Sequence, residues 1–316
     1  MIYLANTYNK YVTMLLTYRR KLMEIRLLRY FVAVASQQTI SAAAQQLHLS
    51  QPTLSRQLSD LENELDTTLF IRGNRKISLT ADGQYLLKKA QEIIQLTDKT
   101  TANFKQKDET LSGEIYIGAG ETKGIQVVAQ ALKKLLQNYP AIQFHLYSGN
   151  ADDIMNKLDS GLLDFGIVIE PADKQKYDYM HLPESDTWGV LMHKDSPLAS
   201  KEEIRSEHLD DKALIISRQT TVDSELSGWL GQEITNLNIV GTYNLLYNAA
   251  QMAKEKLGYV LCLDRLIDAS IDNSLVFKPL TPKLEAGLNI IWKKNQFFST
   301  AAQEFLQELR KTIENE

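Results

Sequence analysis

The feature that most constrains the fold is a change of periodicity near residue 112. Residues 24–66 carry apolar side chains at helical spacing, whereas the chain after Ser112 alternates strand-like apolar runs with helical segments. The two patterns require different kinds of domain, because an all-helical bundle and a sheet covered by helices bury their apolar faces differently. The length of 316 residues has room for two or three domains of ordinary size.

Three helices are predicted at the start of the chain. The first has apolar residues Ile25, Leu28, Phe31, Val32 and Ala35 at helical spacing.

The second and third helices are short and separated by a tight turn. The second is expected over about 42–47 with Ser41 as its N-cap, and the third begins after Ser50, a strong N-cap residue. Pro52 fits the first turn of the third helix, where no helical hydrogen bond is lost. The inward face of this helix is expected to hold Leu54, Leu58, Leu61 and Leu65.

Such a pair of helices fits the logic of a helix-turn-helix, in which the second helix enters the major groove of DNA. Ala43, Ala44 and Leu47 would let the first helix of the pair pack closely, and His48-Leu49 would form the turn. The outward side of the second contains Gln, which can pair with adenine, and Arg, which can pair with guanine. The candidate DNA-binding residues are Ser50, Gln51, Pro52, Thr53, Ser55 and Arg56. A merely solvated helix face would also be polar, so the pattern alone leaves both readings open.

A basic hairpin-like stretch over 71–79 follows, with a turn at Gly73-Asn74. Such a wing could place a cation in the minor groove or on phosphates, although exposed hairpins are often basic without this role. Its candidate DNA-binding residues are Arg72, Arg75 and Lys76.

The charge distribution agrees with an N-terminal DNA-binding module. Residues 1–80 carry ten Lys and Arg against five Asp and Glu, or +5, so the remaining 236 carry −9 of the formal net charge of −4. Residues 1–22 are interpreted as a disordered leader, with Met23 as a candidate natural start. Their only apolar run is too short to span a bilayer, and no signal-peptide pattern follows it.

Thr80 is expected to cap a long helix that runs to about Phe104. About 25 residues make a rod of roughly 37 Å, and a rod with a narrow apolar seam usually pairs with a second helix. The alternative is that the helix packs only on its own domain. The seam comprises Leu86, Ala90, Ile93, Thr97 and Phe104.

The region after 112 predicts an α/β fold with mainly parallel sheets in two lobes. Strands of the first set are expected at 114–119, 142–147 and 163–169, with helices reaching to Tyr139 and Ser160. A second set is expected at 188–193, 213–217, 238–243, 258–264 and 275–280, followed by a strand at 287–292 and a final helix from Ser299.

The stretch from Glu24 to Leu87 closely resembles the DNA-binding domain of LysR-type transcriptional regulators. The segments that carry the resemblance are Leu28–Ala35, Ser41–Leu47, Ser50–Gln57, Leu61–Leu65, Leu69-Phe70 and Leu79–Gly83. The resemblance implies that Gln51, Pro52, Ser55 and Arg56 approach base edges and that Arg75 reaches the minor groove. It also places a methionine at Met23. Asp66 departs from the glycine common after the third helix, which bears on the local turn geometry.

The remainder of the chain resembles the LysR effector domain, which is similar to type 2 periplasmic binding proteins. Gly113–Gly118, Gly161–Ile167 and Gly258–Val260 carry this resemblance. The expected architecture is therefore an N-terminal winged helix-turn-helix, a long linker helix and a two-lobed α/β effector domain. The expected limits are 1–22 for the leader, 23–80 for the DNA-binding domain, 81–111 for the linker or dimerisation helix and 112–316 for the effector domain, with lobe I at about 112–183 and 284–316 and lobe II at about 184–283.

In a two-lobed domain of this kind a ligand is expected between the lobes, at loops following the strands. Arg218 suits a carboxylate, and Glu121 and Glu170 could meet a cationic group, so a small carboxylate or zwitterion is the predicted effector. The alternative is that these charges pair across the cleft and close an empty pocket. The candidate effector-binding residues are Gly120, Glu121, Thr122, Ser148, Gly149, Asn150, Glu170, Ser217, Arg218, Gln219, Tyr243 and Asn244.

Other classes have less support. A solute-binding protein for uptake fits the two lobes but not the helix-turn-helix or the missing signal peptide, and an enzyme would need a catalytic constellation that the sequence lacks. The five histidines are scattered, so no metal is expected. Gly118-Ala119-Gly120 follows a strand as a dinucleotide-binding loop would, but Lys123 stands where its third glycine should be, so no cofactor is expected. The lone Cys262 is interpreted as a buried hydrophobe. The prediction is a cytoplasmic transcription regulator, with no membrane association, that binds double-stranded DNA at a partly palindromic operator. A homodimer or, as the resemblance implies, a homotetramer is expected, and RNA polymerase is a candidate partner.

Overall fold

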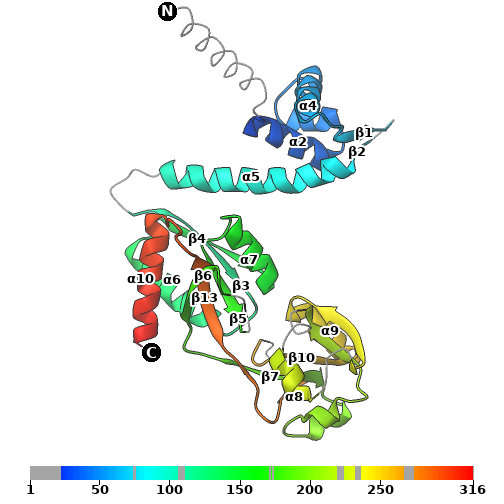
Figure 1. Cartoon of the computed structure of the whole chain (residues 1–316), viewed down its shortest axis with the longest axis vertical. Coiled ribbons are helices and arrows are strands. Elements are labelled where there is room, and N and C mark those ends of the chain that lie inside the picture. Colours follow the sequence, from blue (N-terminus) through cyan, green and yellow to red (C-terminus); the bar gives the residue numbers. More distant parts are fainter. Residues whose placement is uncertain are drawn as a thin grey trace, which may run out of the picture. The chain divides into compact units, whose positions relative to one another are not determined.

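The computed structural model describes residues 23–73, 76–105, 111–170, 172, 174–218, 224–231, 236–266 and 274–315 (Figure 1). The chain divides into two compact units, one up to Thr101 and the other from Ala102 onward. The predicted leader over 1–22 lies outside the described residues, as do two of the predicted site residues, Arg75 and Gln219.

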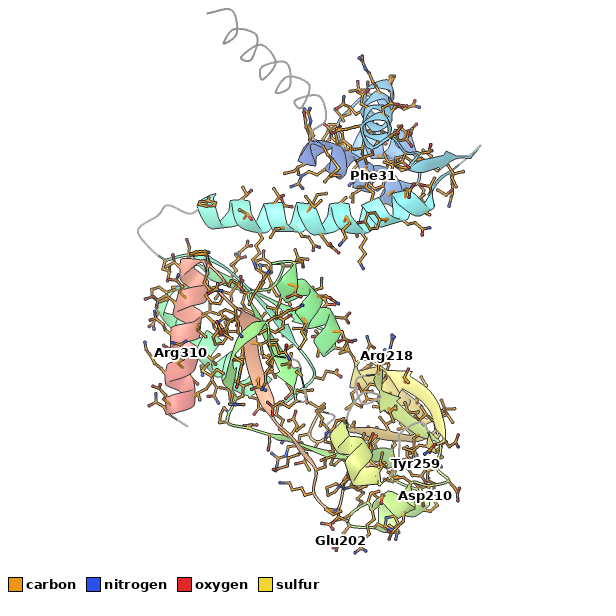
Figure 2. The ribbon with its side chains drawn as sticks, viewed as in Figure 1. Phe31, Glu202, Asp210, Arg218, Tyr259 and Arg310 are labelled. Atoms are coloured by element: carbon orange, nitrogen blue, oxygen red, sulfur yellow. The ribbon has the colours of Figure 1, made fainter. Side chains whose placement is uncertain are left out.

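The N-terminal unit is a winged helix-turn-helix followed by a long helix. Its elements are α2 (Ile25–Gln37), α3 (Ile40–Gln46), α4 (Gln51–Leu65), β1 (Phe70–Arg72), β2 (Ile77–Leu79) and α5 (Ala81–Lys105). Phe31, labelled in Figure 2, is fully buried at its centre, and its ring lies 5.1 Å from that of Phe70. The three helices and the wing therefore share one core.

The buried faces of these helices differ in part from the prediction. In α2 the buried residues are Leu27, Leu28, Phe31 and Val34, whereas Ile25 is 39% exposed. The buried face of α2 is therefore rotated by part of a turn from the predicted one. Leu27 and Val34, at spacing i, i+7, pack inward in place of Ile25. In α4 the prediction for Leu54, Leu58 and Leu61 is confirmed, and that for Leu65, at the exposed C-terminal end, is wrong.

Two caps were predicted in this unit besides Ser50. The cap of α3 is Thr39 and not Ser41, since the Thr39 hydroxyl accepts a hydrogen bond from the Ala42 amide and the helix begins at Ile40. Thr80 caps α5 as predicted, because its Oγ1 accepts from the Gly83 amide at 2.9 Å.

The apolar seam of α5 behaves differently along its length. Leu86 and Ala90 are buried in the core of the N-terminal unit, so this part of the helix packs on its own domain. Farther along, Ile93 is 37% exposed and Phe104 is 77% exposed. The first half therefore follows the alternative reading, and the second half leaves apolar side chains at the surface.

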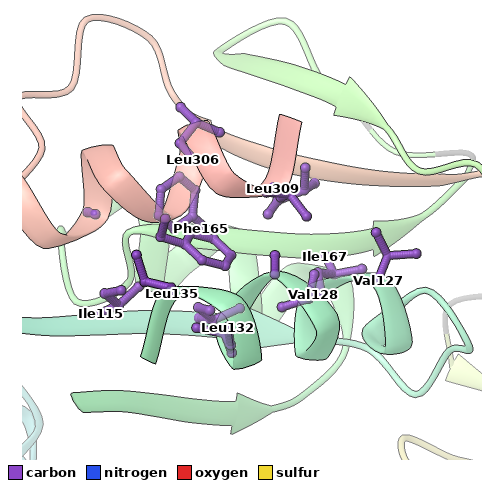
Figure 3. Close-up of a cluster of buried hydrophobic side chains, with 14 of the residues drawn as sticks. Ile115, Val127, Val128, Leu132, Leu135, Phe165, Ile167, Leu306 and Leu309 are labelled. Carbon is purple, nitrogen blue, oxygen red and sulfur yellow. The ribbon is translucent and has the colours of Figure 1, made fainter. Parts of the chain in front are cut away.

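Lobe I of the second unit is a five-stranded sheet in the order β4-β3-β5-β13-β6. Its strands are β3 (Gly113–Ala119), β4 (Ile142–Ser148), β5 (Phe165–Ile169), β6 (Tyr177–His181) and β13 (Leu288–Lys293). Helices α6 (Ile125–Asn138) and α10 (Thr300–Glu314) cover one face, and their apolar side chains meet those of the central strands around Phe165 and Ile167 (Figure 3). Helix α7 (Ala151–Asp159) covers the other face.

Lobe II is built on a second sheet in the order β11-β7-β10-β8-β9, with β12 paired to β7. Its strands are β7 (Asp186–His193), β8 (Leu214–Ser217), β9 (Ile239–Tyr243), β10 (Tyr259–Leu263), β11 (Leu275–Pro279) and β12 (Glu285–Ala286). Its helices are α8 (Ser224–Leu230) and α9 (Leu246–Lys254), with short 3₁₀ segments at Pro197–Ser200 and Ser206–His208. Two clusters of buried side chains lie on this sheet, one of them beneath α9.

The expectation of mainly parallel sheets is wrong, because both sheets are mixed. In lobe I, β3 runs parallel to β4 and β5, but β13 runs antiparallel to β5 and β6. Strand β13 reaches its place by returning from lobe II, so no crossover helix precedes it to set a parallel direction. Strands β6 and β12 were not predicted.

Candidate DNA-binding and effector-binding sites

The N-terminal end of α4 has the geometry of a DNA-reading helix. Ser50 has extended backbone angles, and its Oγ accepts from the Thr53 amide at 3.3 Å, which confirms it as the N-cap. Gln51 and Thr53 are exposed in the first turn of α4, and Arg56 is exposed on the side of the helix away from the buried leucines. Of the other predicted residues, Pro52 is exposed and Ser55 is half-buried. One turn of helix thus carries amide, hydroxyl and guanidinium groups able to reach base edges.

Helix α3 holds the reading helix in place. Ala43 and Ala44 are buried, so the two helices approach closely without large side chains between them. The Leu49 amide donates to the Ala44 carbonyl at 2.9 Å, and His48 takes a positive φ of 55° in the turn. At the other end of α4, Asp66 also lies in the left-handed region, with φ 51° and ψ 39°. Aspartate tolerates this conformation better than most residues, so it replaces the more common glycine here.

The wing is fixed to both neighbouring helices. Glu62 of α4 accepts through Oε1 from the amides of Leu69 and Phe70, at 2.8 and 3.2 Å. On the other strand, the Ile77 amide donates to the Gln38 carbonyl at 2.8 Å. Lys76 is exposed at the base of the turn, whereas the side chain of Arg72 and all of Arg75 lie outside the described atoms. The described part of the wing therefore offers one cation beside the reading helix.

Among the predicted effector-binding residues, Glu121 lies at the junction of the two lobes. It belongs to the loop after β3 in lobe I, and its carboxylate accepts a hydrogen bond from the Leu246 amide at the start of α9 in lobe II. No side chain of α9 itself caps this helix. A carboxylate at a helix N-terminus is favoured by the helix dipole as well as by the hydrogen bond. Glu121 thus joins lobe I to lobe II.

Lys123, two residues after Glu121, makes two more contacts between the lobes. The Lys123 amide donates to Asp186 Oδ1 at 3.3 Å, and its Nζ lies 3.2 Å from Asp264 Oδ2. Both side chains of this ion pair are largely buried, at 12% and 15% exposed. With the Glu121 carboxylate and a hydrogen bond from the Thr122 hydroxyl to Asp186, the 121–123 loop contacts lobe II through four polar groups. The ion pair was not predicted from the sequence.

Asp186, the first residue of β7, is a fully buried carboxyl group. Burial raises its pKa, although hydrogen bonds from the Thr122 hydroxyl and the Lys123 amide act in the opposite direction. Within the described part of the chain, its Oδ2 has no hydrogen-bond partner. A buried polar atom without a hydrogen bond lowers the free energy of unfolding. The Asp186 carboxyl group therefore binds the 121–123 loop to the start of β7 at a cost in stability.

Glu170 at the end of β5 is engaged within its own lobe. Its Oε1 accepts from Lys174 Nζ at 2.6 Å and from the buried Asn289 Nδ2 at 2.8 Å. These two hydrogen bonds hold the pKa of Glu170 below its ordinary value. A methyl group on Gly287 would lie only 2.5 Å from the Glu170 carboxylate, so the absence of a side chain there lets the carboxylate approach the strand.

The other predicted effector-binding residues divide by lobe. In lobe I, Gly149 donates its amide to the Ala119 carbonyl at 3.1 Å, and Asn150 caps α7. Gly120, Thr122 and Ser148 lie at the ends of the same strands or just after them. The carboxyl ends of β3, β4 and β5 thus bring the lobe I candidates to one edge of the sheet.

In lobe II, the Tyr243 hydroxyl donates to the Leu261 carbonyl at 2.9 Å, and burial raises the pKa of this phenol well above its ordinary value. Asn244 caps the next amide, at Leu245, with its own side chain. Ser217 is half-buried and Arg218 is exposed (Figure 2). The Tyr243 hydroxyl is therefore bound within lobe II, whereas the side chains of Asn244 and Arg218 are exposed.

Three residues at the lobe junction, Lys123, Asp186 and Asp264, were not predicted from the sequence. A signal for Asp186 exists, since a lone acidic residue opens the otherwise apolar and aromatic run of β7. Asp264 likewise ends an apolar run. A charged residue at the end of a buried strand can therefore mark a position where a strand leaves the core.

Two further predicted properties concern chemistry. Cys262 is buried as predicted, and burial raises the pKa of its thiol far above the ordinary value. In the part of the chain that the structure covers, no group of three or more His, Cys, Asp and Glu side chains could hold a metal ion. No helix among the described residues has the length and apolar character needed to cross a membrane.

Comparison with known proteins identifies a family for each of the two domains. The family model described as LysR substrate binding domain matches residues 108–314, and the one described as bacterial regulatory helix-turn-helix protein, lysR family, matches residues 25–84. The Hca operon transcriptional activator HcaR of Escherichia coli is 29% identical over 282 residues, which are 87% of this chain and 93% of that protein. The dual regulator OxyR of the same species is 33% identical over 181 residues, 57% of this chain and 59% of its own length.

Solved structures show the same fold. Full-length CbnR complexed with its target DNA superposes with a TM-score of 0.70 at 19% identity, over 92% of this chain and all of that one. Full-length BenM gives a TM-score of 0.51 at 22% identity, over 92% and 96% of the two chains. The winged helix-turn-helix, the two-lobed α/β unit and the family matches to both place this chain in the LysR family of DNA-binding transcriptional regulators, which carry an effector-binding domain.

Proposed function

We propose that this regulator recognises a partly palindromic operator in double-stranded DNA through the first turn of α4 and through the wing. The exposed side chains of Gln51, Thr53 and Arg56 near the capped start of α4 carry this proposal, because they combine base-reading groups with a rigid helix start. Lys76 would contact phosphate rather than bases. We propose 23–80 as the DNA-binding domain, 81–111 as the linker and 112–316 as the effector domain.

Two variants separate base reading from phosphate contact. Arg56→Ala should cost roughly 1–3 kcal/mol of operator affinity and relax the sequence preference at one position. Lys76→Ala should weaken binding to all sequences and reduce the salt dependence, because one fewer counterion is released. The assay is a salt titration of binding to operator and unrelated duplexes with the full chain. Lys88→Ala, which removes an exposed lysine of α5, is the charge-matched control. Unchanged operator affinity and preference in Arg56→Ala would mean that α4 is not the reading helix.

A palindromic operator requires a two-fold assembly, which we attribute to α5. Tyr85, Ile93, Leu96 and Phe104 are 70%, 37%, 41% and 77% exposed. At about 100° per residue they fall within an arc of about 100° on one side of the helix. An exposed apolar stripe of this length favours pairing with the same helix of a second chain. Leu96→Glu with Phe104→Glu should dissociate this pair in sedimentation velocity, and an unaltered oligomer would refute the role of α5.

Pairing of effector domains would extend the dimer to a tetramer. Each lobe has an edge strand with exposed apolar side chains, Phe144 and Leu146 on β4 in lobe I and Val240 on β9 in lobe II. Tyr247 of α9, 66% exposed, adds to the lobe II surface. An edge strand that exposes apolar groups is usually covered in a stable protein. Leu146→Lys should reduce a tetramer to a dimer, whereas the α5 variant above should disrupt the dimer as well.

The effector is proposed to be a small carboxylate or zwitterion that binds between the lobes near Glu121 and Arg218. The contact of Glu121 with the start of α9 supports an anion at this place, since the α9 N-terminus already interacts with a carboxylate. An effector carboxylate would compete with Glu121 for that amide and release one of the links between the lobes. Calorimetric titration of candidate acids and amino acids into the wild type and Arg218→Ala tests the proposal. An acid that keeps its full affinity in Arg218→Ala would exclude Arg218 as its anchor.

A redox signal is less well supported than a bound effector. Several relatives are named hydrogen peroxide-inducible genes activators. This chain has a single cysteine, so it cannot form a disulfide within one chain, and the Cys262 thiol is buried with a raised pKa. Since the thiolate is the form that reacts, such a thiol is a poor sensor. We therefore propose that the signal is a bound molecule, that the regulator acts in the cytoplasm where its operator lies, and that RNA polymerase is its partner at the promoter.

A further inference from the structure

A hollow in the effector domain lies at the far end of α9 from Glu121. Its volume is about 190 Å³, and it lies between the end of β7 and the start of β10. The residues that matter for its chemistry are His193, Ser196, Pro197, Ala253, Lys256 and Tyr259. Figure 2 labels Tyr259 within lobe II. We refer to this hollow as the α9 end pocket.

The α9 end pocket is separate from the lobe junction. Helix α9 runs from Leu246, whose amide contacts Glu121, to Lys254, and Ala253 near its C-terminal end lines the pocket. Seven steps of 1.5 Å, from Leu246 to Ala253, place the two sites about 10 Å apart along the helix. Strand β10 leads to the same conclusion, because Tyr259 at its start lines the pocket, while Asp264 just beyond its end pairs with Lys123. A ligand in this pocket would therefore not occupy the cleft between the lobes.

Hydrogen-bond donors dominate the polar lining. Tyr259 accepts from the Ser196 hydroxyl at 2.8 Å, which leaves the phenolic proton for another acceptor. His193 accepts at Nδ1 from the Asp195 amide at 3.2 Å, and this nitrogen also lies 3.5 Å from Asp195 Oδ2, which leaves the Nε2 proton for another acceptor. Lys256 contributes an ammonium group with three donors.

The charged side chains of the lining are Lys256 and Asp195. Its one carboxylate, Asp195, is 60% exposed and pairs with Lys256 at 3.1 Å. The hydrogen bond from Lys256, with smaller effects from His193 and Lys194, holds the pKa of Asp195 below its ordinary value. One lysine and one carboxylate thus line the pocket, and the ammonium of Lys256 still has protons for a second acceptor. The lining is therefore suited to a ligand that carries one negative charge.

The remaining lining and the volume limit the size of the ligand. Pro197 and Ala253 provide apolar walls opposite the polar groups. A cavity of about 150 Å³ in another protein accommodates benzene, so about 190 Å³ has room for a body of similar size with a small head group. A dianion or a nucleotide would find too few cations and too little space.

We propose that the α9 end pocket binds a small monocarboxylate, with the carboxylate at Lys256 and Tyr259 and the apolar body against Pro197 and Ala253. This is a second ligand site in the regulator, additional to the effector between the lobes. Helix α9 joins the two sites. A ligand in the pocket would contact the C-terminal end of the helix whose N-terminal end Glu121 binds.

The test compares three probes that share one alkyl chain. Butyrate, 1-butanol and n-butylamine are titrated by calorimetry into the full-length wild-type protein, and only butyrate should show saturable binding with one site per chain. Binding of the alcohol or the amine as tightly as the acid would overturn the proposed anion site. Butyrate binding that does not saturate, with a Kd above about 10 mM, would also overturn the proposed anion site.

Two variants locate the site. Lys256 has a positive φ of 60°, which asparagine also adopts, so Lys256→Asn removes the cation with little change in the backbone. Butyrate affinity should fall by about tenfold or more in Lys256→Asn, and by a few-fold in Tyr259→Phe, which keeps the ring. Lys176→Asn, at an exposed lysine of lobe I, should bind as the wild type does. Unchanged affinity in both pocket variants would show that butyrate binds elsewhere and would refute the assignment.

Discussion

Replacement of Glu121 by alanine tests how the two lobes are held together. In the structure the Glu121 carboxylate accepts from the Leu246 amide at the start of α9, across the lobe boundary. A hydrogen bond to a charged group contributes about 1.5–3 kcal/mol, and each 1.4 kcal/mol corresponds to a factor of ten in an equilibrium. Glu121→Ala should therefore increase the population in which this amide is open by about 10- to 100-fold.

Hydrogen–deuterium exchange of the full chain measures this opening directly. With exchange resolved to single amides by fragmentation in the mass spectrometer, the Leu246 amide should exchange about 10- to 100-fold faster in Glu121→Ala. Glu121→Gln should have a smaller effect, since an amide oxygen can still accept but lacks the charge that the helix N-terminus favours.

A neighbouring residue provides the control. Asn244 accepts from the Leu245 amide at 3.0 Å, so Asn244→Ala should accelerate exchange at Leu245 and leave Leu246 protected. If Leu246 exchanges equally in the wild type and in Glu121→Ala, Glu121 does not hold α9, and the competition proposed between this carboxylate and an effector has no basis.

Three further predictions concern stability and reactivity. Burial raises the pKa of Asp186, so the folded state favours its protonated form. The free energy of unfolding should therefore fall as the pH rises from the ordinary pKa of 3.8 through the raised pKa. Denaturation measured at several pH values should show this fall in the wild type and not in Asp186→Asn. If the free energy of unfolding depends on pH in the same way in the wild type and in Asp186→Asn, folding does not raise the pKa of Asp186. Cys262 should resist iodoacetamide at neutral pH until urea unfolds lobe II, and rapid alkylation of the native protein would contradict its burial. Phe31→Ala should lower the free energy of unfolding of the N-terminal unit by about 3–5 kcal/mol in urea titrations, and a loss below about 1 kcal/mol would contradict its central place in the core.

The N-terminal unit could be predicted well because its signals are local. Ser50 followed by Pro52 determines where α4 begins, and the leucines at 54, 58 and 61 determine which side is buried, all within one helix. Errors arose where two local signals compete. Both Thr39 and Ser41 can cap a helix, and only the packing of α3 decides between them.

The sheet directions could not be predicted in the same way. An apolar run such as that of β13 indicates a buried strand but not its neighbour or its direction. Here the neighbours of β13 are β5 and β6, more than 100 residues earlier in the chain, and the return from lobe II makes both pairings antiparallel. Strand β6 was missed because its sequence, Tyr-Asp-Tyr-Met-His, alternates polar and aromatic residues without a clear apolar face.

The effector site shows why a list of polar residues at strand ends does not give their roles. Glu121 and Glu170 look equivalent in the sequence, since each follows a buried strand of lobe I. In the structure, Glu170 is bound by Lys174 and Asn289 of its own lobe, whereas Glu121 contacts an amide 125 residues away in lobe II. An effector that displaced the Glu170 carboxylate would break its two hydrogen bonds within lobe I with no effect on α9, whereas an effector that displaced Glu121 would release the start of α9. Of these two glutamates, Glu121 is the one that contacts lobe II, so under the proposed function an effector that displaced Glu121 would change how the two lobes are held together.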